Sequence, residues 1–353
     1  TPSPGKGGRP SRTKGETQYL RKVIKLDEPI LKVKGLCTEF KTVDSRIRAV
    51  DGVDLELYPG ETLGIVGESG CGKSVTALSI MQLLPKGVGK VVDGQILFDG
   101  KDMLKLSTKE LLSLHGRDMA MIFQEPMTSL NPVYTIGYQL SEVLRYHMGM
   151  NKKDAWQKSI DLLKDVGVSR PEQIVRSYPH ELSGGMLQRV MIAMGLSCNP
   201  KLLIADEPTT ALDVTIQAQI LELMGKLKEE YNTAILMITH NMGVVAEVCD
   251  RVIVMYAGYV VEMAEVNELF DNPSHPYTQG LLKCIPNIDE DREVLDTIEG
   301  TVPPPYAMPK GCRFAPRCPY ATPECEANKP ELYDIGGGHT CRCFRYKEGN
   351  PNA

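Results

Sequence analysis

The chain has 353 residues, of which 42% are hydrophobic and 24% are charged, so a disordered or fibrous protein is excluded. At about 150 residues per domain, this length predicts about two domains. The net charge of −5 gives no reason to expect nucleic acid as a partner. No apolar run approaches the ~20 residues of a membrane-spanning helix, and no signal peptide is evident, so we expect a chain that does not cross a membrane by itself.

Residues 1–29 form a basic N-terminal segment. Seven Lys and Arg residues and one Glu fall within the first 26 residues, with few apolar side chains. Such a segment cannot bury enough apolar surface to fold by itself, so we expect a disordered tail. The alternative is a basic arm that contacts anionic lipid or a partner.

Residues 30–270 show the pattern of an α/β domain. Short β-branched runs alternate with helical stretches, which predicts a largely parallel sheet with helices on its faces. Turn signals within 30–57 and 90–99 indicate a small antiparallel β subdomain, and two helix-like stretches indicate a helical subdomain at about 135–185. The apolar runs are 30–33, 62–67, 118–123, 201–206, 233–239 and 251–256.

Residues 271–353 differ in composition from the rest of the chain. Proline clusters at 303–305, and five of the ten cysteines fall between 312 and 343. We expect a small Cys-rich C-terminal domain here. A Pro-bounded amphipathic helix is predicted for 272–282.

The sequence GESGCGKS at 67–74 fits the phosphate-loop pattern G-x-x-x-x-G-K-[ST]. It follows an apolar run and precedes a helical stretch, which is the context in which this motif binds phosphate. Backbone N–H groups and the positive end of the following helix would hold phosphate oxygens. Lys73 would reach the β- and γ-phosphates, and Ser74 would bind Mg²⁺.

A second signal is KLLIADEP at 201–208. Its apolar residues predict a buried strand that brings Asp206 and Glu207 to the sheet edge where α/β proteins bind ligands. Asp206 would hold Mg²⁺, directly or through water, and Glu207 would act as general base for the attacking water. Alone, an Asp-Glu pair after a strand is more often a helix cap or a solvated turn; the phosphate loop makes the metal site the better interpretation.

A third signal is LSGGMLQR at 182–189. Ser183, Gly184 and Gly185 open a helical run, where they either cap the helix or form a second anion site. A phosphate loop and a separate phosphate-binding helix end in one chain indicate that two copies share each nucleotide.

In this order along the chain, five features resemble the ABC transporter ATPase family: GESGCGKS, Gln124 in IFQEP, LSGGM, LLIADEP followed by ALD at 211–213, and His240 in ITH. The resemblance spans about 30–345. It implies a P-loop NTPase fold with a RecA-like core sheet, an antiparallel β subdomain and a helical subdomain.

The resemblance also implies a role for each matching residue. Catalysis would use Glu207, His240 and Gln124, and Mg²⁺ would be held by Ser74, Gln124 and Asp206. ATP would contact Phe40, Gly67, Ser69, Gly70, Cys71, Gly72, Lys73, Ser74 and Val75, with Phe40 stacking on adenine unless it is only a core strand residue. The nucleotide of the opposite subunit would be capped by Ser183, Gly184, Gly185, Met186 and the D-loop residue Asp213.

The sequences HELSGGMLQRVMIAMGL and LLIADEPTTALDVTIQAQI resemble the D-type ATPase subunit of dipeptide and oligopeptide importers. One departure from the common signature is Met186, which replaces Gln. The general base Glu207 is present, but Met186 leaves open whether both composite ATP sites hydrolyse equally.

The cysteine-rich tail has the pattern Cys312-x₅-Cys318-x₆-Cys325-x₁₇-Cys343, with Cys341 in addition. These gaps exceed those of common zinc folds, whereas iron–sulfur clusters need four thiolates and tolerate wider loops. On spacing alone, iron–sulfur, zinc, and disulfides or free thiols all stay open. GCRFAPRCPYATPEC and GHTCRC resemble the tails of D-type and F-type peptide-importer ATPases, some of which carry a [4Fe–4S] cluster. The resemblance implies a structural cluster on Cys312, Cys318, Cys325 and Cys343, with Cys343 in preference to Cys341.

The function implied by the resemblance is that of an ATPase coupled to transport, which powers uptake of di- or oligopeptides by an ABC importer. Its partners would be a second ATPase subunit in a heterodimer, two transmembrane permease subunits and an extracytoplasmic solute-binding protein. The chain would lie peripherally on the cytoplasmic face of the cell membrane. Nickel and oligosaccharide importers have similar ATPases and stay open as alternatives.

A soluble ABC ATPase of DNA repair or translation is a distant alternative. Repair versions need a long coiled coil between the two halves of the ATPase, and no heptad stretch of that length interrupts 75–200. Ribosomal versions usually carry two cassettes, whereas this chain has one phosphate loop.

Overall fold

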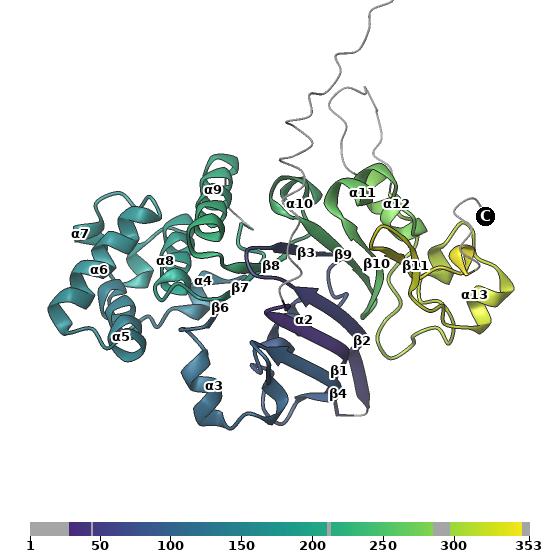
Figure 1. The fold of residues 1–353 in the computed structure, drawn as a ribbon, viewed down its shortest axis with the longest axis horizontal. Coiled ribbons are helices and arrows are strands. Elements are labelled where there is room, and N and C mark those ends of the chain that lie inside the picture. Colours follow the sequence, from purple (N-terminus) through teal and green to yellow (C-terminus); the bar gives the residue numbers. More distant parts are fainter. Residues whose placement is uncertain (1–27, 44, 210–212, 285–296, 348–353) are drawn as a thin grey trace, which may run out of the picture.

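The computed structural model describes residues 28–43, 45–209, 213–284 and 297–347, so the expected disordered tail at 1–29 falls almost entirely outside the described residues. A long central sheet runs across the molecule (Figure 1). Helices α5 to α8 lie at one end of it, the C-terminal segment lies at the other, and β1, β2 and β4 form a second sheet beside its middle.

The main sheet has eight strands in the order β11-β12-β10-β9-β3-β8-β7-β6. The five strands from β9 to β6 in this order run parallel to one another. Every residue of β3, β7 and β8 is buried, as in sheets that helices cover on both faces. The parallel strands are β3 (Thr62–Val66), β6 (Met119–Ile122), β7 (Leu202–Asp206), β8 (Ala234–Ile238) and β9 (Arg251–Tyr256). The runs predicted at 62–67, 118–123, 201–206, 233–239 and 251–256 are therefore confirmed as strands.

The second sheet is antiparallel and has the order β2-β1-β4-β5. It contains β1 (Leu31–Lys41), β2 (Arg46–Leu57), β4 (Gly89–Phe98) and β5 (Lys101–Asp102). The antiparallel pairing expected for 30–57 and 90–99 is confirmed. A hydrogen bond of 2.8 Å between the hydroxyls of Thr38 and Ser79 joins β1 to α2 (Lys73–Ile80), so this sheet packs on the helix that follows the phosphate loop.

Helices form most of the chain between β6 and β7. The two main ones, α5 (Ile136–Met148) and α6 (Lys152–Asp165), start at Thr135 and Asn151, whose side chains accept hydrogen bonds from the first-turn N–H groups. Between β5 and β9 the described chain also contains the helices α3 (Thr108–Leu114), α4 (Pro126–Ser129), α7 (Pro171–Ile174), α8 (Gly184–Leu196), α9 (Val214–Tyr231) and α10 (Met242–Val248), with short 3₁₀ turns at Met103–Lys105 and Pro179–Glu181.

The C-terminal segment, for which the sequence predicts a small Cys-rich domain, extends the main sheet. Strand β12 (His339–Cys341) pairs with β10 (Tyr259–Glu265), and β11 (Tyr333–Gly336) pairs with β12. This hairpin covers an edge of the sheet that β10 would otherwise expose. The segment also contains α11 (Val266–Asp271), α12 (Pro276–Lys283), α13 (Pro323–Ala327) and 3₁₀ turns at Ala315–Arg317 and Phe344–Tyr346; α12 confirms the helix predicted for 272–282.

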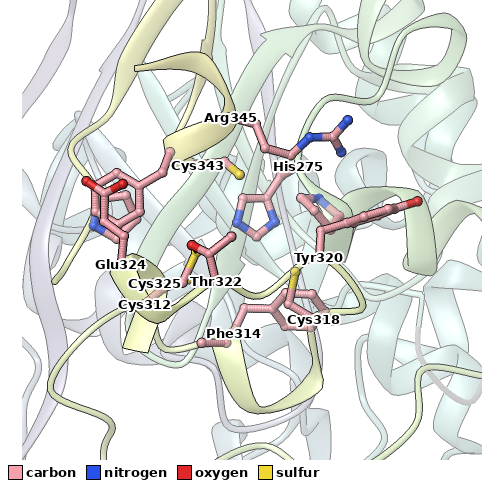
Figure 2. A pocket seen from close by; sticks show the side chains of 14 residues that line it. His275, Cys312, Phe314, Cys318, Tyr320, Thr322, Glu324, Cys325, Cys343 and Arg345 are labelled. Atoms are coloured by element: carbon pink, nitrogen blue, oxygen red, sulfur yellow. The ribbon is translucent and has the colours of Figure 1, made fainter. Parts of the chain in front are cut away.

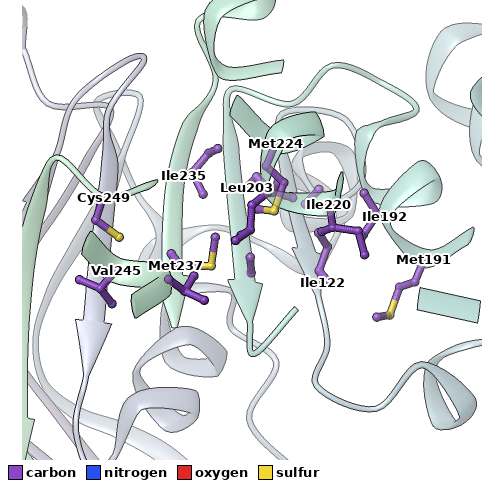
Figure 3. Close-up of a cluster of buried hydrophobic side chains, with 14 of the residues drawn as sticks. Ile122, Met191, Ile192, Leu203, Ile220, Met224, Ile235, Met237, Val245 and Cys249 are labelled. Carbon is purple, nitrogen blue, oxygen red and sulfur yellow. The ribbon is translucent and has the colours of Figure 1, made fainter. Parts of the chain in front are cut away.

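Two clusters of buried apolar side chains join these parts: one includes residues of the antiparallel sheet, such as Leu31 and Val53, and the larger one extends from the helical end to the C-terminal segment. Figure 3 shows side chains from β6, β7 and β8 against others from α8, α9 and α10, among them Ile122, Leu203, Met237 and Ile192. The same cluster of buried residues continues to Tyr277 and Phe314 in the C-terminal segment. In the described residues, no helix is both long and apolar enough to cross a bilayer.

Candidate functional site

The loop from Gly67 to Ser74 connects the C-terminal end of β3 to the N-terminus of α2. Ser69 and Gly70 are exposed at its tip, whereas Cys71 and Gly72 are buried at its base. Gly72 has φ of 103°, and a Cβ atom there would come 2.7 Å from the carbonyl oxygen of Ala49, so this position requires glycine. The loop is a tight turn at a helix N-terminus with its tip open to solvent, an arrangement suited to phosphate groups.

Lys73 is the first residue of α2 and is only 6% exposed. Its Nζ atom donates to the carbonyl oxygens of Gly67, at 2.7 Å, and Glu68, at 3.1 Å. The ammonium group therefore lies across the first half of the loop. A phosphate oxygen that replaced these carbonyls would gain a charge-assisted hydrogen bond.

Ser74 and Asp206 lie together, although 132 positions separate them in the chain. The Ser74 hydroxyl donates to Oδ1 of Asp206 at 3.0 Å, which joins the start of α2 to the end of β7. Burial raises the pKa of the Asp206 carboxyl, and the hydrogen bond from Ser74 opposes that rise. A hydroxyl and a carboxylate are the hard oxygen ligands that Mg²⁺ prefers, so the two side chains fit a metal ion bound beside a phosphate.

Glu207 joins two other predicted residues. Its carboxylate accepts a hydrogen bond from Nε2 of Gln124 at 3.0 Å and lies 3.1 Å from Nδ1 of His240. The backbone of Glu207 has φ of 48°, a conformation that non-glycine residues adopt at a cost, and its N–H donates to Ile238 of β8 at 2.9 Å. The three residues leave β7, β6 and β8, so the sheet edge assembles them into one group next to Asp206.

The segment 183–186 lies at the surface at the start of α8. Ser183 is the N-cap residue, but its side chain makes no capping hydrogen bond, and a Cβ atom on Gly184 would contact nothing within 4 Å. Ser183 and Gly184 are exposed, and Gly185 and Met186 are half-buried. The side chain of Ser183 therefore does not cap α8, which was the first interpretation of this motif. The N-terminus of the helix is open to solvent.

The positions of three other predicted site residues do not by themselves decide their predicted contacts with ATP. These residues are Phe40, Val75 and Asp213. Phe40 is half-buried near the end of β1, opposite Gly89 of β4, where a Cβ atom would come 2.9 Å from the phenyl ring. Val75 is half-buried in α2. Asp213 is exposed and caps α9 by accepting a hydrogen bond of 2.9 Å from the N–H of Ile216. The remainder of the ALD motif, at 211–212, lies outside the described residues.

Gln188, which is buried on α8, is a residue of this region that the motifs did not single out. Its Nε2 atom donates to the carbonyl oxygen of Pro208 at 2.6 Å and so ties the exposed segment to the loop that carries Glu207. The position of Gln188 within LSGGMLQR was the only available signal.

A cavity of about 190 Å³ in the C-terminal segment is lined by Cys312, Cys318, Cys325 and Cys343. Figure 2 shows these four side chains around one space, with His275, Phe314 and Tyr320 beside them. Cys341 does not line the cavity and is fully buried on β12. The four cysteines singled out from the sequence are thus the four that share this cavity.

The thiols of Cys312, Cys318 and Cys343 carry raised pKa values, with burial as the largest cause. Burial raises the pKa of Cys343 to about 11, and the neighbouring cysteines 312, 318 and 325 add to the rise. All ten cysteines fall in the described part of the chain, and none of them forms a disulfide. Across the same described residues, no three His, Cys, Asp or Glu side chains are grouped closely enough to hold a single metal ion.

An apolar groove of about 300 Å³ lies between the main sheet and the helical end. It runs from Met81 and Leu83, after α2, to Met191 and Met194 of α8. Phe123, next to Gln124, lines it, and Leu83 is 41% exposed. The groove therefore reaches the chain neighbour of Gln124, whose side chain contacts Glu207.

Comparison with known families gives two matches. Residues 50–210 match the family model described as ABC transporter, and residues 261–325 match the one described as Oligopeptide/dipeptide transporter, C-terminal region. The first match contains the phosphate loop and Glu207, and the second contains three of the four cavity cysteines.

Relatives of known name are similar over nearly their whole length. The chain is 57% identical to the oligopeptide transport ATP-binding protein AppD of Bacillus subtilis, covering 90% of this chain and 97% of that one. It is 49% identical to the dipeptide transport ATP-binding protein DppD of Escherichia coli, covering 89% and 96%. Among solved structures, the ATP-binding cassette MJ0796, a dimer bound to ADP and Pi, is 28% identical with a TM-score of 0.62 and covers 67% of this chain and 98% of its own.

Proposed function

Since this chain belongs to the ABC transporter family, among the ATP-binding proteins of peptide import, we propose that it hydrolyses ATP to drive peptide uptake through permease subunits. It is the ATPase subunit of a peptide ABC importer. The observation that carries this conclusion is the assembly of Glu207, Gln124 and His240 at the sheet edge that also holds the phosphate loop.

ATP would bind along the phosphate loop, through Gly67, Ser69, Gly70, Cys71, Gly72, Lys73, Ser74 and Val75. The exposed tip of the loop, the buried ammonium group of Lys73 and the N-terminus of α2 support this assignment. Phe40 would stack on adenine; its half-buried ring at the end of β1 and the link between β1 and α2 support that placement.

Mg²⁺ would be held by Ser74, Asp206 and Gln124. The hydrogen bond between Ser74 and Asp206 supports the first two ligands, and the adjacent contact between Gln124 and Glu207 supports the third. The metal would neutralise charge on the phosphate oxygens. Burial disfavours the ionised form of the Asp206 carboxyl, and a bound cation would stabilise that form.

Glu207 would act as general base and polarise the water that attacks the γ-phosphate. Its side chain is only 14% exposed, and its hydrogen bond with Gln124 and its contact with His240 fix the direction of its carboxylate. His240, whose side chain is 61% exposed, would contact the γ-phosphate. Because a positioned base acts only within hydrogen-bond reach, the fixed carboxylate is the feature that hydrolysis requires.

Ser183, Gly184, Gly185 and Met186, with Asp213, would cap ATP bound to a second ATPase subunit. The support is the exposed helix end, whose hydroxyl is not used for capping. Backbone N–H groups at a helix N-terminus favour anions. The partner would be a related ATPase in a heterodimer.

The permease subunits would dock in the apolar groove between the sheet and the helical end. Support comes from its exposed apolar side chains, including Phe123, at 36% exposed, and Leu83. Phe123 is followed in the chain by Gln124, whose side chain donates a hydrogen bond to Glu207. A permease subunit that contacts Phe123 would therefore be coupled to the carboxylate of Glu207 through Gln124. An extracytoplasmic solute-binding protein would deliver the peptide, and this subunit would lie on the cytoplasmic face of the membrane.

A [4Fe–4S] cluster would bind to Cys312, Cys318, Cys325 and Cys343. Four thiols around one cavity of about 190 Å³ match the four-thiolate requirement of such a cluster. The cluster would hold together a segment that has few regular elements of its own. Burial disfavours ionisation of Cys343, so a cationic iron core would favour the thiolate form.

ATP-driven transport by the isolated complex tests the proposed function. Complex purified with its permease subunits should release phosphate from ATP and accumulate labelled peptide in vesicles. Nickel and a labelled oligosaccharide are the comparison cargoes. Accumulation of one of those cargoes in place of peptide would overturn the peptide assignment while leaving the ATPase in place.

A further inference from the structure

Glu68, the second residue of the phosphate loop, is held by three groups at once. Its backbone N–H donates to the hydroxyl of Tyr277 at 2.9 Å. Its carboxylate accepts from Nη1 of Arg317, with distances of 3.1 and 3.0 Å to the two oxygens. Its carbonyl accepts from Lys73 at 3.1 Å. Two of these three anchors come from the C-terminal segment, more than 200 positions along the chain.

Arg317 is itself rigidly placed. Its side chain is only 5% exposed, and it donates to the carbonyl oxygens of Glu299 and Ile298 at 2.9 and 3.0 Å. It also lies over the ring of Tyr256. A guanidinium with this many fixed partners loses little further freedom when it binds a carboxylate, so its contact with Glu68 is well defined.

Tyr277 is equally constrained. It is fully buried and packs against Tyr256 and Phe314, with ring centroids 4.7 and 5.5 Å away. Tyr256 ends β9, and Phe314 belongs to the segment between Cys312 and Cys318. The hydroxyl that accepts the Glu68 N–H is therefore fixed by the aromatic cluster that joins the C-terminal segment to the main sheet.

A second arginine reaches the same loop by an indirect route. Arg313 donates to the carbonyl oxygen of Ala257 and binds Asp51 at 2.5 Å. Gly258, which follows Ala257 in the chain, donates its N–H to the carbonyl oxygen of Cys71 in the phosphate loop at 2.9 Å. The segment 312–318 thus reaches the loop at two points, directly at Glu68 and through the 257–258 turn at Cys71.

We propose that Arg317 and Tyr277 are positioning residues for ATP binding, which hold the phosphate loop in its binding conformation through Glu68. The proposal rests on the proposed function, in which this loop binds ATP. A loop fixed in advance does not lose conformational freedom when its ligand arrives, which raises affinity. Arg317 also neutralises a carboxylate that would otherwise repel the phosphates.

The test is a double-mutant cycle read out by titration with a fluorescent ATP analogue and by ATPase kinetics. Arg317→Gln should raise Kd for the nucleotide on the order of tenfold. KM for ATP should rise with it, while kcat changes less than about twofold, because the catalytic carboxylate is not involved. Arg317→Lys keeps the charge and should restore part of the affinity. Glu68→Gln combined with Arg317→Gln should cost no more than the Arg317 variant alone.

Two further variants keep the test decisive. Tyr277→Phe retains the aromatic packing and removes only the hydroxyl, so it should raise Kd without a large change in thermal unfolding. Lys347→Gln breaks a surface ion pair with Glu324 in the same segment and should leave Kd unchanged. Wild-type Kd in both Arg317→Gln and Tyr277→Phe, or fully additive losses in the cycle, would overturn the proposal. Lys73→Ala separates the two claims: unchanged affinity there would instead refute the phosphate site itself.

Discussion

Nδ1 of His240 lies 3.1 Å from Oε1 of Glu207, although 33 positions separate the two residues in the chain. Glu207 follows β7 and His240 follows β8, and these two strands are parallel neighbours in the main sheet. Parallel neighbours end at the same edge, so the pairing of two buried strands brings a carboxylate and an imidazole together. The fold thereby brings together the two residues proposed to act in catalysis, although they are far apart in the sequence.

Replacement of Glu207 by Gln should abolish ATP turnover and preserve ATP binding. The amide keeps the size of the side chain and its hydrogen-bonding reach but cannot accept a proton from water. We expect the rate of phosphate release to fall at least ~100-fold, with Kd for ATP changed little. Steady-state phosphate release and nucleotide titration measure both quantities. Wild-type hydrolysis by this variant would remove Glu207 from the role of base.

Replacement of Lys73 by Ala should weaken ATP binding itself. The ammonium group lies across the loop and would bind phosphate oxygens through charge-assisted hydrogen bonds, so its loss should raise Kd roughly 10- to 100-fold. Equilibrium titration with a fluorescent ATP analogue measures the change. The exposed Lys101 serves as control, and Lys101→Ala should bind ATP as the wild type does. Equal affinities of all three proteins would contradict the assignment of the loop.

Replacement of Asp206 by Asn should stabilise the nucleotide-free protein at neutral pH. Burial raises the pKa of Asp206 in the folded state, so the folded protein ionises it at a cost that the unfolded chain does not carry. That cost is absent at acidic pH, where both states are protonated, and develops as pH rises through the unfolded and then the folded pKa. The midpoint of thermal unfolding should therefore be a few degrees higher, roughly 2–4 °C, for the variant at pH 7.5, and the difference should vanish only below the unfolded pKa, at about pH 3.

Added Mg²⁺ and ATP should reverse this order. The wild type would gain a cation beside the carboxylate, whereas the amide binds Mg²⁺ poorly, so ligand-induced stabilisation should be smaller for Asp206→Asn. A variant that is less stable than the wild type without ligand at pH 7.5 would contradict the raised pKa.

Replacement of Cys312 by Ser should remove iron and acid-labile sulfide from anaerobically purified protein. About four iron atoms per chain are expected in the wild type, with the brown absorption of a cluster. Cys341→Ser should retain that iron, because Cys341 does not line the cavity, and Cys198→Ser, on a distant helix end, is a second control. A colourless wild type that contains zinc would overturn the cluster assignment.

Much of the nucleotide site could be predicted from the sequence. The phosphate loop and Glu207 directly follow buried strands, Asp206 ends one, and the segment 183–186 begins a helix, so local pattern alone places each of them at the end of a strand or the start of a helix. The parallel strands could also be predicted from the sequence, because their residues form continuous apolar runs. The left-handed backbone conformation of Glu207 could not be predicted, since it depends on a hydrogen bond from its N–H to Ile238 of a neighbouring strand.

The role of the C-terminal segment could not be predicted in the same way. The hairpin of β11 and β12 extends the main sheet through pairing between Glu262 and Cys341, and no local pattern specifies the partner of an edge strand. The ion pair between Arg317 and Glu68 spans 249 positions and involves two charged residues that composition alone would place on the surface. The Pro- and Cys-rich composition predicts a small C-terminal domain but does not reveal that its buried side chains, such as Tyr277 and Phe314, join the apolar cluster of the main sheet.

The most direct test of the account is peptide uptake by the complex reconstituted in vesicles, with ATP supplied to the face that carries this subunit. We predict that labelled peptide accumulates only with hydrolysable ATP, and that Glu207→Gln abolishes accumulation in a complex of unchanged composition. Equal accumulation by the wild type and the Glu207 variant, or accumulation without ATP, would contradict the account.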